Sequence, residues 1–301
     1  MKGGRRAHGL VTALLRRRRT CGWFVAARPK GFTVIEVMIV LAVTGALFIS
    51  AALLISGRQQ QTQFNLAIRE AQSQIQRVIN EVGAGYYPNM GTFNCTVNGT
   101  NPPTITATTG GGQGVHEDCI FMGKVIQFKV ANTDPEEMRV YTLVGRRLSS
   151  ENPGAEAGSR ATARPVVIAP TTSNSSIPDG SERIPLQGGL TVVSMTWGAD
   201  SANTGAIGFS QSLASYSGGV IESGSQNIDV VPIRNATMNM TPPQAATAIN
   251  DNFATSPINI ASGTRICFAS GTTNQSGLIV VGGAGRQLSV TLDIKSNRTC
   301  S

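Results

Sequence analysis

Residues 32–55 constrain this chain more than any other stretch. These 24 residues, FTVIEVMIVLAVTGALFISAALLI, are apolar apart from one carboxylate, Glu36, and three hydroxyl side chains, Thr33, Thr44 and Ser50. A helix of this length spans roughly 36 Å at about 1.5 Å per residue, which exceeds a bilayer hydrocarbon core of about 30 Å. The segment therefore predicts a membrane-spanning helix, and the acid near its start requires an explanation.

The positive charge of the chain is concentrated before this helix. The whole chain has a formal net charge of +8. Residues 1–31 contain seven Arg, two Lys and no acid, so they carry +9 and the remaining 270 residues carry −1. Because basic residues mark the cytoplasmic side of a membrane helix, we expect the leader inside and residues after 57 outside. A charge of −1 gives the rest of the chain no bulk attraction for nucleic acid or anionic lipid.

Two ordinary interpretations of this amino terminus leave Glu36 unexplained. A secretory signal peptide would be cleaved in a stretch of small residues such as 20–27, TCGWFVAA, but Arg28 and Lys30 follow that stretch. An uncleaved signal anchor explains the charge and the length without giving the acid a role. In that case Glu36 would only extend its carboxylate to the lipid headgroups.

A third interpretation comes from the stretch KGFTVIEVMIVLAVTGAL, residues 30–47. It resembles the amino-terminal signature of type IV pilins and of the pseudopilins of type II secretion systems. In that family a prepilin peptidase cuts on the cytoplasmic face after a glycine, which matches Gly31, and N-methylates the new first residue, which matches Phe32. The fifth mature residue of the family is a Glu, which matches Glu36. The leader is long for the family, so translation could start at a downstream codon.

The physical role of Glu36 is consistent with that resemblance. Cleavage after Gly31 would create a positive amine on Phe32, about one helical turn from Glu36. In a bundle of parallel helices, the amine of an incoming subunit can pair with Glu36 of a neighbour. Such a pair is stronger in a low dielectric than in water. We therefore expect Glu36 to act in assembly and in setting the register of the helices.

The helix is predicted to continue beyond the membrane segment. Residues 58–85 are largely polar and carry a narrow stripe of apolar side chains spaced by 4, 3, 4, 3 and 4, at Phe64, Ile68, Ala71, Ile75, Val78 and Val82. Gly83, Gly85 and Pro88 end the pattern, so one helix of about fifty residues is expected. The stripe suits a solitary coiled coil or packing against a sheet of the same chain. We expect the sheet, because strand-like segments follow.

Those segments predict an antiparallel β domain. The predicted strands are residues 119–130, 139–148, 165–170, 189–197, 226–233, 264–270, 277–281 and 286–295. In the first strand, Met122, Ile126, Phe128 and Val130 are expected on one side. In the fourth, 189–197, Val193, Met195 and Trp197 alternate. Residues 89–115 and 149–190 are predicted to be loops apart from 165–170, and a hairpin turn is expected at Gly282-Gly283. The carboxy-terminal strands loosely resemble those of the H-type minor pseudopilins.

The predicted fold class is α+β, with the long helix packed against the sheet in a pilin-like arrangement. The expected divisions are a cleaved basic leader, 1–31, a transmembrane and filament-core helix, 32–56, its amphipathic continuation, 57–84, and an extracytoplasmic β-rich domain, 85–301.

Four cysteines follow the leader, which itself contains Cys21. Cys95, Cys119, Cys267 and Cys300 are an even number, which suits two disulfides in an oxidising compartment. Four free thiols would be natural in a cytosolic protein. Sequence alone allows three pairings, and we expect neighbours to pair.

The sequence offers weak signals for chemistry. His116, Glu117 and Asp118 could ligate a metal or form a solvated turn, and DPEE, residues 134–137, could be a calcium turn or a plain β-turn. Gly110–112 lacks the Gly-Lys-Ser/Thr of a phosphate loop. No G-x-S-x-G occurs, and only one His follows the leader. We therefore predict neither a metal, a cofactor nor an enzyme.

Taken with the resemblance, these features predict a structural, low-copy subunit of a type IV pilus or type II secretion pseudopilus. The implied partners are a prepilin peptidase and N-methyltransferase, other pilins or pseudopilins, an inner-membrane platform protein, an assembly ATPase and membrane lipid. The expected location is the cytoplasmic membrane and then the filament. The alternative is a membrane-tethered adhesin or DNA-uptake module that binds through loops 89–115 and 149–190, with Arg146-Arg147 as a local basic patch.

Overall fold

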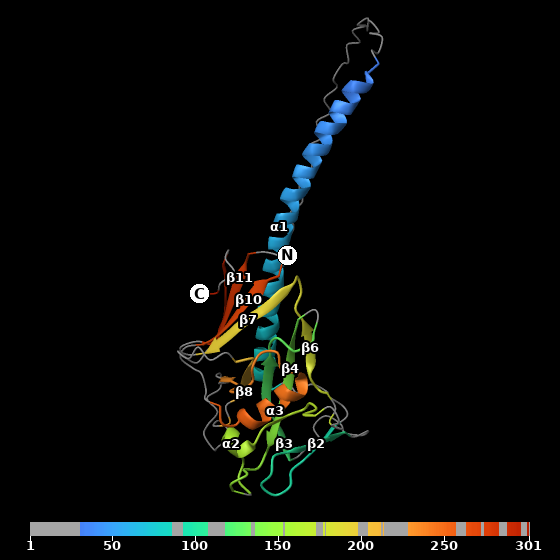
Figure 1. Cartoon of the computed structure of the whole chain (residues 1–301). Coiled ribbons are helices and arrows are strands. Elements are labelled where there is room, and N and C mark those ends of the chain that lie inside the picture. Colours follow the sequence, from blue (N-terminus) through green and yellow to red (C-terminus); the bar gives the residue numbers. More distant parts are fainter. Residues whose placement is uncertain are drawn as a thin grey trace, which may run out of the picture. The chain divides into compact units, whose positions relative to one another are not determined.

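The computed structural model describes residues 31–85, 93–107, 118–133, 136–152, 154–172, 177, 179–197, 204–211, 213, 228–256, 263–271, 274–282, 288–295 and 300 (Figure 1). The predictions about residues 1–30, Gly110–112, His116, Glu117, the Asp134-Pro135 turn and Gly283 lie outside these residues. The chain divides into two compact units, Met1–Ala52 and Leu53–Ser301. Each unit is described in turn.

Helix α1, Val34–Gly83, has 50 residues and runs through the boundary between the units. The sequence predicted one helix of about this length. It contains no proline that would interrupt its hydrogen bonds. It ends where Gly85 adopts a left-handed φ of +65° and donates its N–H to the carbonyl of Val82 at 3.0 Å. A glycine in this conformation satisfies the last carbonyls of a helix at no steric cost.

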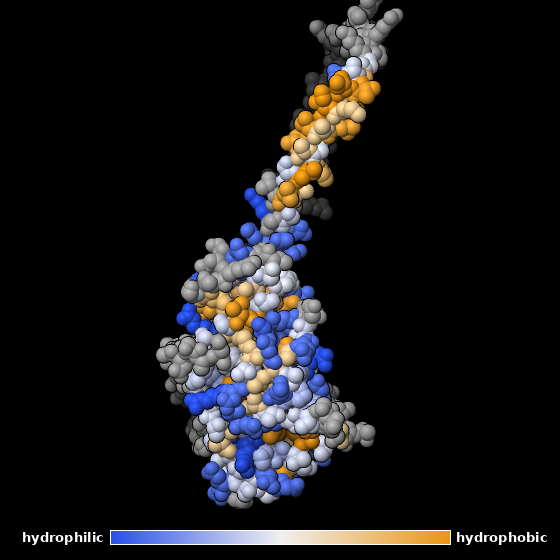
Figure 2. All heavy atoms as spheres, viewed as in Figure 1, coloured by the Kyte–Doolittle hydropathy of each residue, from blue (hydrophilic) through white to orange (hydrophobic). Residues whose placement is uncertain are grey.

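In the first unit the described side chains are all exposed. Figure 2 shows that the surface of this part of α1 is predominantly hydrophobic. By length and composition, α1 is the one helix of the described residues that could cross a membrane. An apolar helix surface of this size needs a cover of lipid or of other helices.

The described residues of the second unit form three antiparallel sheets and, besides α1, two shorter helices. The strands are β1 Phe93–Thr96, β2 Thr104–Ala107, β3 Cys119–Gln127, β4 Glu137–Arg146, β5 Val166–Val167, β6 Glu182–Pro185, β7 Leu190–Trp197, β8 Ala206–Gln211, β9 Ile228–Pro232, β10 Thr264–Ser270, β11 Ser276–Val281 and β12 Val290–Lys295. The helices are α2, Arg160–Ala163, and α3, Pro242–Asn252. The architecture is α+β, as predicted.

The strands are ordered β12-β11-β10-β7 in a four-stranded sheet and β5-β4-β3-β8-β9 in a six-stranded sheet, in which β6 also pairs with β4. Strands β1 and β2 form a separate pair. The meander predicted at the carboxyl end is therefore confirmed as β10, β11 and β12.

The apolar stripe of α1 forms the centre of the main core. Its six predicted members, Phe64, Ile68, Ala71, Ile75, Val78 and Val82, are at most 3% exposed. They pack with side chains from both larger sheets, among them Phe128, Phe209, Phe268 and Ile279. The stripe thus packs against sheets of the same chain, and a solitary coiled coil is excluded for this part of α1.

Helix α3 belongs to a second core, on the opposite face of the six-stranded sheet, and sequence reasoning missed it. Ala245, Ala246 and Ile249 are buried there with Val125 and Phe253. The signals for this helix are present in the sequence: a Thr241–Gln244 capping box, with Pro at the first helical positions. Its short length and many alanines made the apolar periodicity weak.

Two predicted strand faces are wrong because each strand contains a β-bulge. In β3 the register with β4 shifts between Phe121 and Gly123, so Met122 lies in the second core, opposite the face of Ile126. In β7 the pairing partners of Cys267 and Phe268 are Ser194 and Val192, so Val193 is the extra residue and is 51% exposed. A bulge inserts one residue and reverses the alternation beyond it.

Two predicted loops also contain regular structure. Strands β1 and β2 lie within residues 89–115, and α2 and β6 lie within residues 149–190. These elements have four residues each, which is too short for a periodic pattern to predict.

Glu136 connects the two larger sheets beside β4. Its side-chain oxygen accepts the N–H of Val192 in β7 at 2.8 Å, and its carbonyl accepts the N–H of Leu186 at 2.8 Å. Burial raises the pKa of the Glu136 carboxyl above its ordinary value, an effect opposed by the Val192 hydrogen bond and by the charge of Lys129.

Because the folded state binds this proton more tightly than the unfolded state, the contribution of Glu136 to stability decreases as the pH rises from about 4.5 through the raised pKa. Glu136→Gln keeps the acceptor for Val192 but does not ionise. We expect the free energy of unfolding of the variant, relative to the original chain, to increase between pH 4 and pH 7. Urea unfolding across this range measures the difference, with the exposed Glu156→Gln as control. A difference that is independent of pH would contradict the linkage.

Candidate assembly site

The start of α1 places Glu36 in a capping box with Thr33. The Oε2 atom of Glu36 accepts the backbone N–H of Thr33 and the Thr33 hydroxyl, both at 3.0 Å. In return, Thr33 Oγ1 lies 3.3 Å from the backbone N–H of Glu36, which donates to it. The spacing Thr-x-x-Glu is a sequence signature of a helix start, but sequence reasoning did not use it.

This arrangement holds the carboxylate in place and leaves part of it available. Only Oε2 is engaged by Thr33, and within residues 31–85 the Oε1 atom of Glu36 forms no hydrogen bond. Gly31 and Phe32, the residues on either side of the expected cleavage, are exposed, with Phe32 at 83%. The site therefore combines exposed residues at the expected cleavage position with an acid held by hydrogen bonds one helical turn away.

Thr33 provides a test of whether this fixed geometry matters. We expect Thr33→Ala to reduce incorporation of the chain into filaments by a few fold, because the carboxylate loses the hydrogen bond from the Thr33 hydroxyl and the Glu36 N–H loses its acceptor, while the backbone N–H of residue 33 remains. Thr33→Ser keeps both donors and is expected to assemble like the original chain. Quantitative immunoblots of sheared filaments, normalised to processed protein in membranes, give the comparison. Equal assembly of both variants would show that the capping box is dispensable.

The four cysteines of the second unit lie in two disulfides. Cys95 in β1 is bonded to Cys119 in β3, and Cys267 in β10 is bonded to Cys300. These are the neighbour pairs expected from the sequence. One bond links the β1–β2 pair to the six-stranded sheet, and the other fastens the carboxyl terminus to the four-stranded sheet.

Ion pairs fix α1 to the six-stranded sheet on one side of the stripe. Lys124 in β3, only 4% exposed, contacts Glu81, and Glu81 also pairs with Arg77 at 3.3 Å. Arg77 reaches Glu182 in β6. A buried charge without a partner is costly, so this network favours one position of the helix along the sheet.

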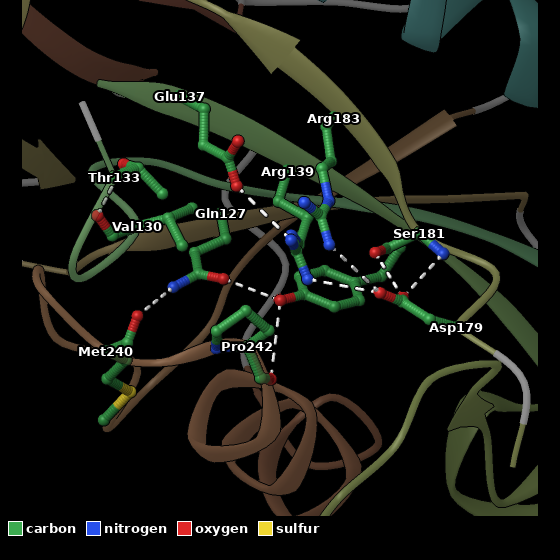
Figure 3. Close-up of polar contacts among 11 residues, drawn as sticks. Gln127, Val130, Thr133, Glu137, Arg139, Asp179, Ser181, Arg183, Met240 and Pro242 are labelled. Atoms are coloured by element: carbon green, nitrogen blue, oxygen red, sulfur yellow. Dashed lines mark hydrogen bonds and ion pairs between the residues drawn. The ribbon is translucent and has the colours of Figure 1, made fainter. Parts of the chain in front are cut away.

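A second polar cluster lies between β4, β6 and α3 (Figure 3). Arg139 is buried and contacts Glu137 at 3.3 Å and Asp179 at 3.4 Å. Asp179 also lies 4.0 Å from the exposed Arg183. The charges of the two acids and two arginines cancel, so the cluster carries no net charge that would attract a charged ligand.

The same cluster extends to Tyr141, whose hydroxyl donates to Oε1 of Gln127 at 2.7 Å. Gln127 in turn donates from Nε2 to the carbonyl of Met240, just before α3, at 2.8 Å. Burial raises the pKa of the Tyr141 phenol above its ordinary value, so the hydroxyl stays protonated and continues to donate at neutral pH. The contacts connect β3, β4 and α3, which gives them a structural role.

Other candidate sites receive little support. Within the described residues, no three His, Cys, Asp or Glu side chains gather where a metal could bind. Of the proposed basic patch, Arg146 is 3% exposed and donates to the carbonyls of Leu148 and Asn101 at 3.1 and 2.9 Å. The prediction of a DNA-binding Arg146-Arg147 surface is therefore wrong for Arg146.

Comparison with known proteins found a match at the amino-terminal part of the chain. Residues 27–52 match the family model described as the prokaryotic N-terminal methylation motif, the prepilin-type signature of type IV pilins and pseudopilins. The match includes Gly31, Phe32, Thr33 and Glu36 and covers only the amino-terminal part of the chain. No curated protein and no solved structure matches the chain. The motif supports a type IV pilin-like or pseudopilin subunit, with processing by a prepilin peptidase and assembly with other pilins.

Proposed function

We propose that this chain is a minor structural subunit of a type IV pilus or a type II secretion pseudopilus. The observation that carries the proposal is the capped Glu36 at the start of an apolar helix whose surface is exposed throughout residues 31–52. Parallel copies of this helix would cover one another. The free side of each carboxylate would then meet the amine of a neighbouring Phe32 in a low dielectric.

The steps of assembly follow from these parts. The basic leader is held in the cytoplasm, the peptidase cleaves after Gly31, and Phe32 is N-methylated. Residues 32–56 hold the subunit in the cytoplasmic membrane, with the domain from residue 85 on the outer side. A platform protein and an ATPase then lift the subunit into the filament. Two loop-rich excursions and a second helical layer make the domain large, which favours a low-copy component.

The amino terminus of the protein in native membranes tests this proposal. Mass analysis is expected to find a chain that begins with N-methylated Phe32. Gly31→Leu, which places a bulky side chain at the cleavage site, is expected to leave the leader attached. An intact leader on the unsubstituted chain, in cells with an active prepilin peptidase, would overturn the proposal and favour a permanent signal anchor.

A further inference from the structure

Strand β12 lies at one edge of the four-stranded sheet and, among the described strands, pairs with β11 alone. Its six residues pair with β11 in one continuous register without a bulge. The Gly282 N–H donates to the carbonyl of Ser289 at 3.0 Å, which identifies this pair as hydrogen-bonded. In an antiparallel ladder such pairs alternate, so Thr291, Asp293 and Lys295 direct their backbone groups to β11.

The alternate residues, Val290, Leu292 and Ile294, direct their backbone groups away from the sheet. A side-chain contact agrees with this assignment, because Nε2 of Gln72 in α1 donates to the carbonyl of Val290 at 3.0 Å. Within the described residues, the outward N–H and C=O groups of Leu292 and Ile294 form no hydrogen bond. The edge therefore offers two donors and two acceptors in the pattern that an added strand requires.

Most other edges of the two larger sheets carry features that prevent such pairing. Strand β6 contains Pro185, and β9 ends with Pro232. In β5, which has two residues, the N–H of Val167 is bound by Oδ1 of Asn250 at 2.8 Å. The opposite edge of the four-stranded sheet, β7, is bulged at Val193, and its Met195 carbonyl accepts the N–H of Thr204 at 3.1 Å. In β12 the Val290 carbonyl is bound by Gln72, but within the described residues the outward groups of Leu292 and Ile294 have none of these protections.

We propose that β12 is a docking edge for an extended segment of a different polypeptide, which would add to the sheet as a fifth strand. Backbone hydrogen bonds to Leu292 and Ile294 would supply the recognition. The side chains of Leu292 and Ile294 are partly buried and pack against the main core, whereas Thr291 and Asp293 are exposed on the other face. A basic residue opposite Asp293 would add a favourable cross-strand charge pair.

A second copy of this chain fits the edge poorly. Antiparallel pairing of two β12 strands places a two-fold axis perpendicular to the sheet. Because α1 packs against the face of this sheet, that axis would reverse the direction of α1 in the second copy. Two copies anchored in one membrane have parallel helices, so they cannot pair in this way. This step rests on the proposed membrane anchoring, whereas the free edge itself does not.

The test measures binding of a short fluorescent peptide, Thr-Val-Lys-Val-Thr-Val, to the full chain in detergent micelles by fluorescence anisotropy. Ile294→Pro removes an outward N–H and obstructs the edge, and Ile294→Ala is the matched control that shortens the side chain but keeps the N–H. We expect the proline variant to bind the peptide at least about tenfold more weakly than the alanine variant. Replacing the Lys of the peptide by Glu is expected to weaken binding to the original chain, because Asp293 repels it.

Equal binding by the two variants, or binding that ignores the sign of the peptide charge, would overturn the proposal. Self-association of the chain that Ile294→Pro abolishes, without peptide binding, would also overturn it and assign the edge to a second copy. Thermal unfolding of each variant verifies that the sheet is intact. Because peptide binding does not depend on cleavage after Gly31, failure of this proposal is distinguishable from failure of the proposed assembly.

Discussion

Glu36→Gln is expected to leave cleavage after Gly31 intact and to lower incorporation into filaments at least about tenfold. Gln at this position can still accept the hydrogen bonds of Thr33, because its side-chain oxygen replaces Oε2. The variant therefore removes the negative charge while it keeps the capped start of α1. A loss of assembly would show that the charge, and not the helix cap, is what a neighbouring subunit uses.

The test measures, in the same cells, the fraction of the chain that is cleaved after Gly31 and the fraction that is incorporated into filaments. Glu70→Gln is a suitable control, because Glu70 is an exposed acid of the same helix outside the apolar segment. It is expected to assemble like the original chain. If Glu36→Gln assembled normally while Thr33→Ala did not, the carboxyl group would serve to cap the helix and the proposed intermolecular pair would be refuted.

Gly277→Ala is expected to destabilise the second unit by about 1–3 kcal/mol. Gly277 lies in β11, where α1 crosses the four-stranded sheet. A methyl group on Gly277 would lie 1.8 Å from Cδ1 of Ile68, a side chain that is fully buried. The helix can approach this strand closely only because the glycine leaves room for Ile68. The clash would shift α1 or force Ile68 out of its preferred rotamer.

A double-mutant cycle separates this contact from a general effect of alanine. Ile68→Ala is expected to cost about 2–5 kcal/mol by itself, since it leaves a cavity. In that background Gly277→Ala should cost about 1 kcal/mol less than in the original chain, because the clashing atom is absent. Gly158→Ala, at an open position, is the control and should have little effect. Additive changes in the urea midpoint would show that Ile68 and Gly277 do not interact.

The sequence predicted the long helix and its buried face. Phe64, Ile68 and Ile75 recur at a spacing that only a helix can place on one side, and that face is buried in the structure. The sequence also predicted the carboxyl-terminal meander, because apolar and polar residues alternate there over strands long enough to show the pattern. It also pointed to Glu36, since a single acid within an apolar helix is costly enough to be informative. Gly31 and Phe32 were indicated only by the resemblance to the prepilin-type signature.

Sequence reasoning failed where the determining contact is distant in the chain. The bulges at Met122 and Val193 reverse side-chain faces, and each is defined by the neighbouring strand. Arg146 reads as a surface cation but is buried, because the carbonyl of Asn101 lies within reach of its guanidinium only after folding. Helix α3 is stabilised mainly by its burial against the six-stranded sheet. Its capping residues mark where it begins, but no local pattern shows that it is buried there.

By itself, then, the sequence determined the elements whose period or cost is local: the apolar helix, its acid and its stripe, and the alternating strands near the carboxyl end. Only the tertiary structure decided where α1 sits against the sheets, through the Ile68–Gly277 contact and the Lys124–Glu81 pair, and which edge strand remained open. The physical reason is that the spacing of apolar residues shows which side of an element must be buried. What that side packs against depends on contacts between residues that are distant in the sequence.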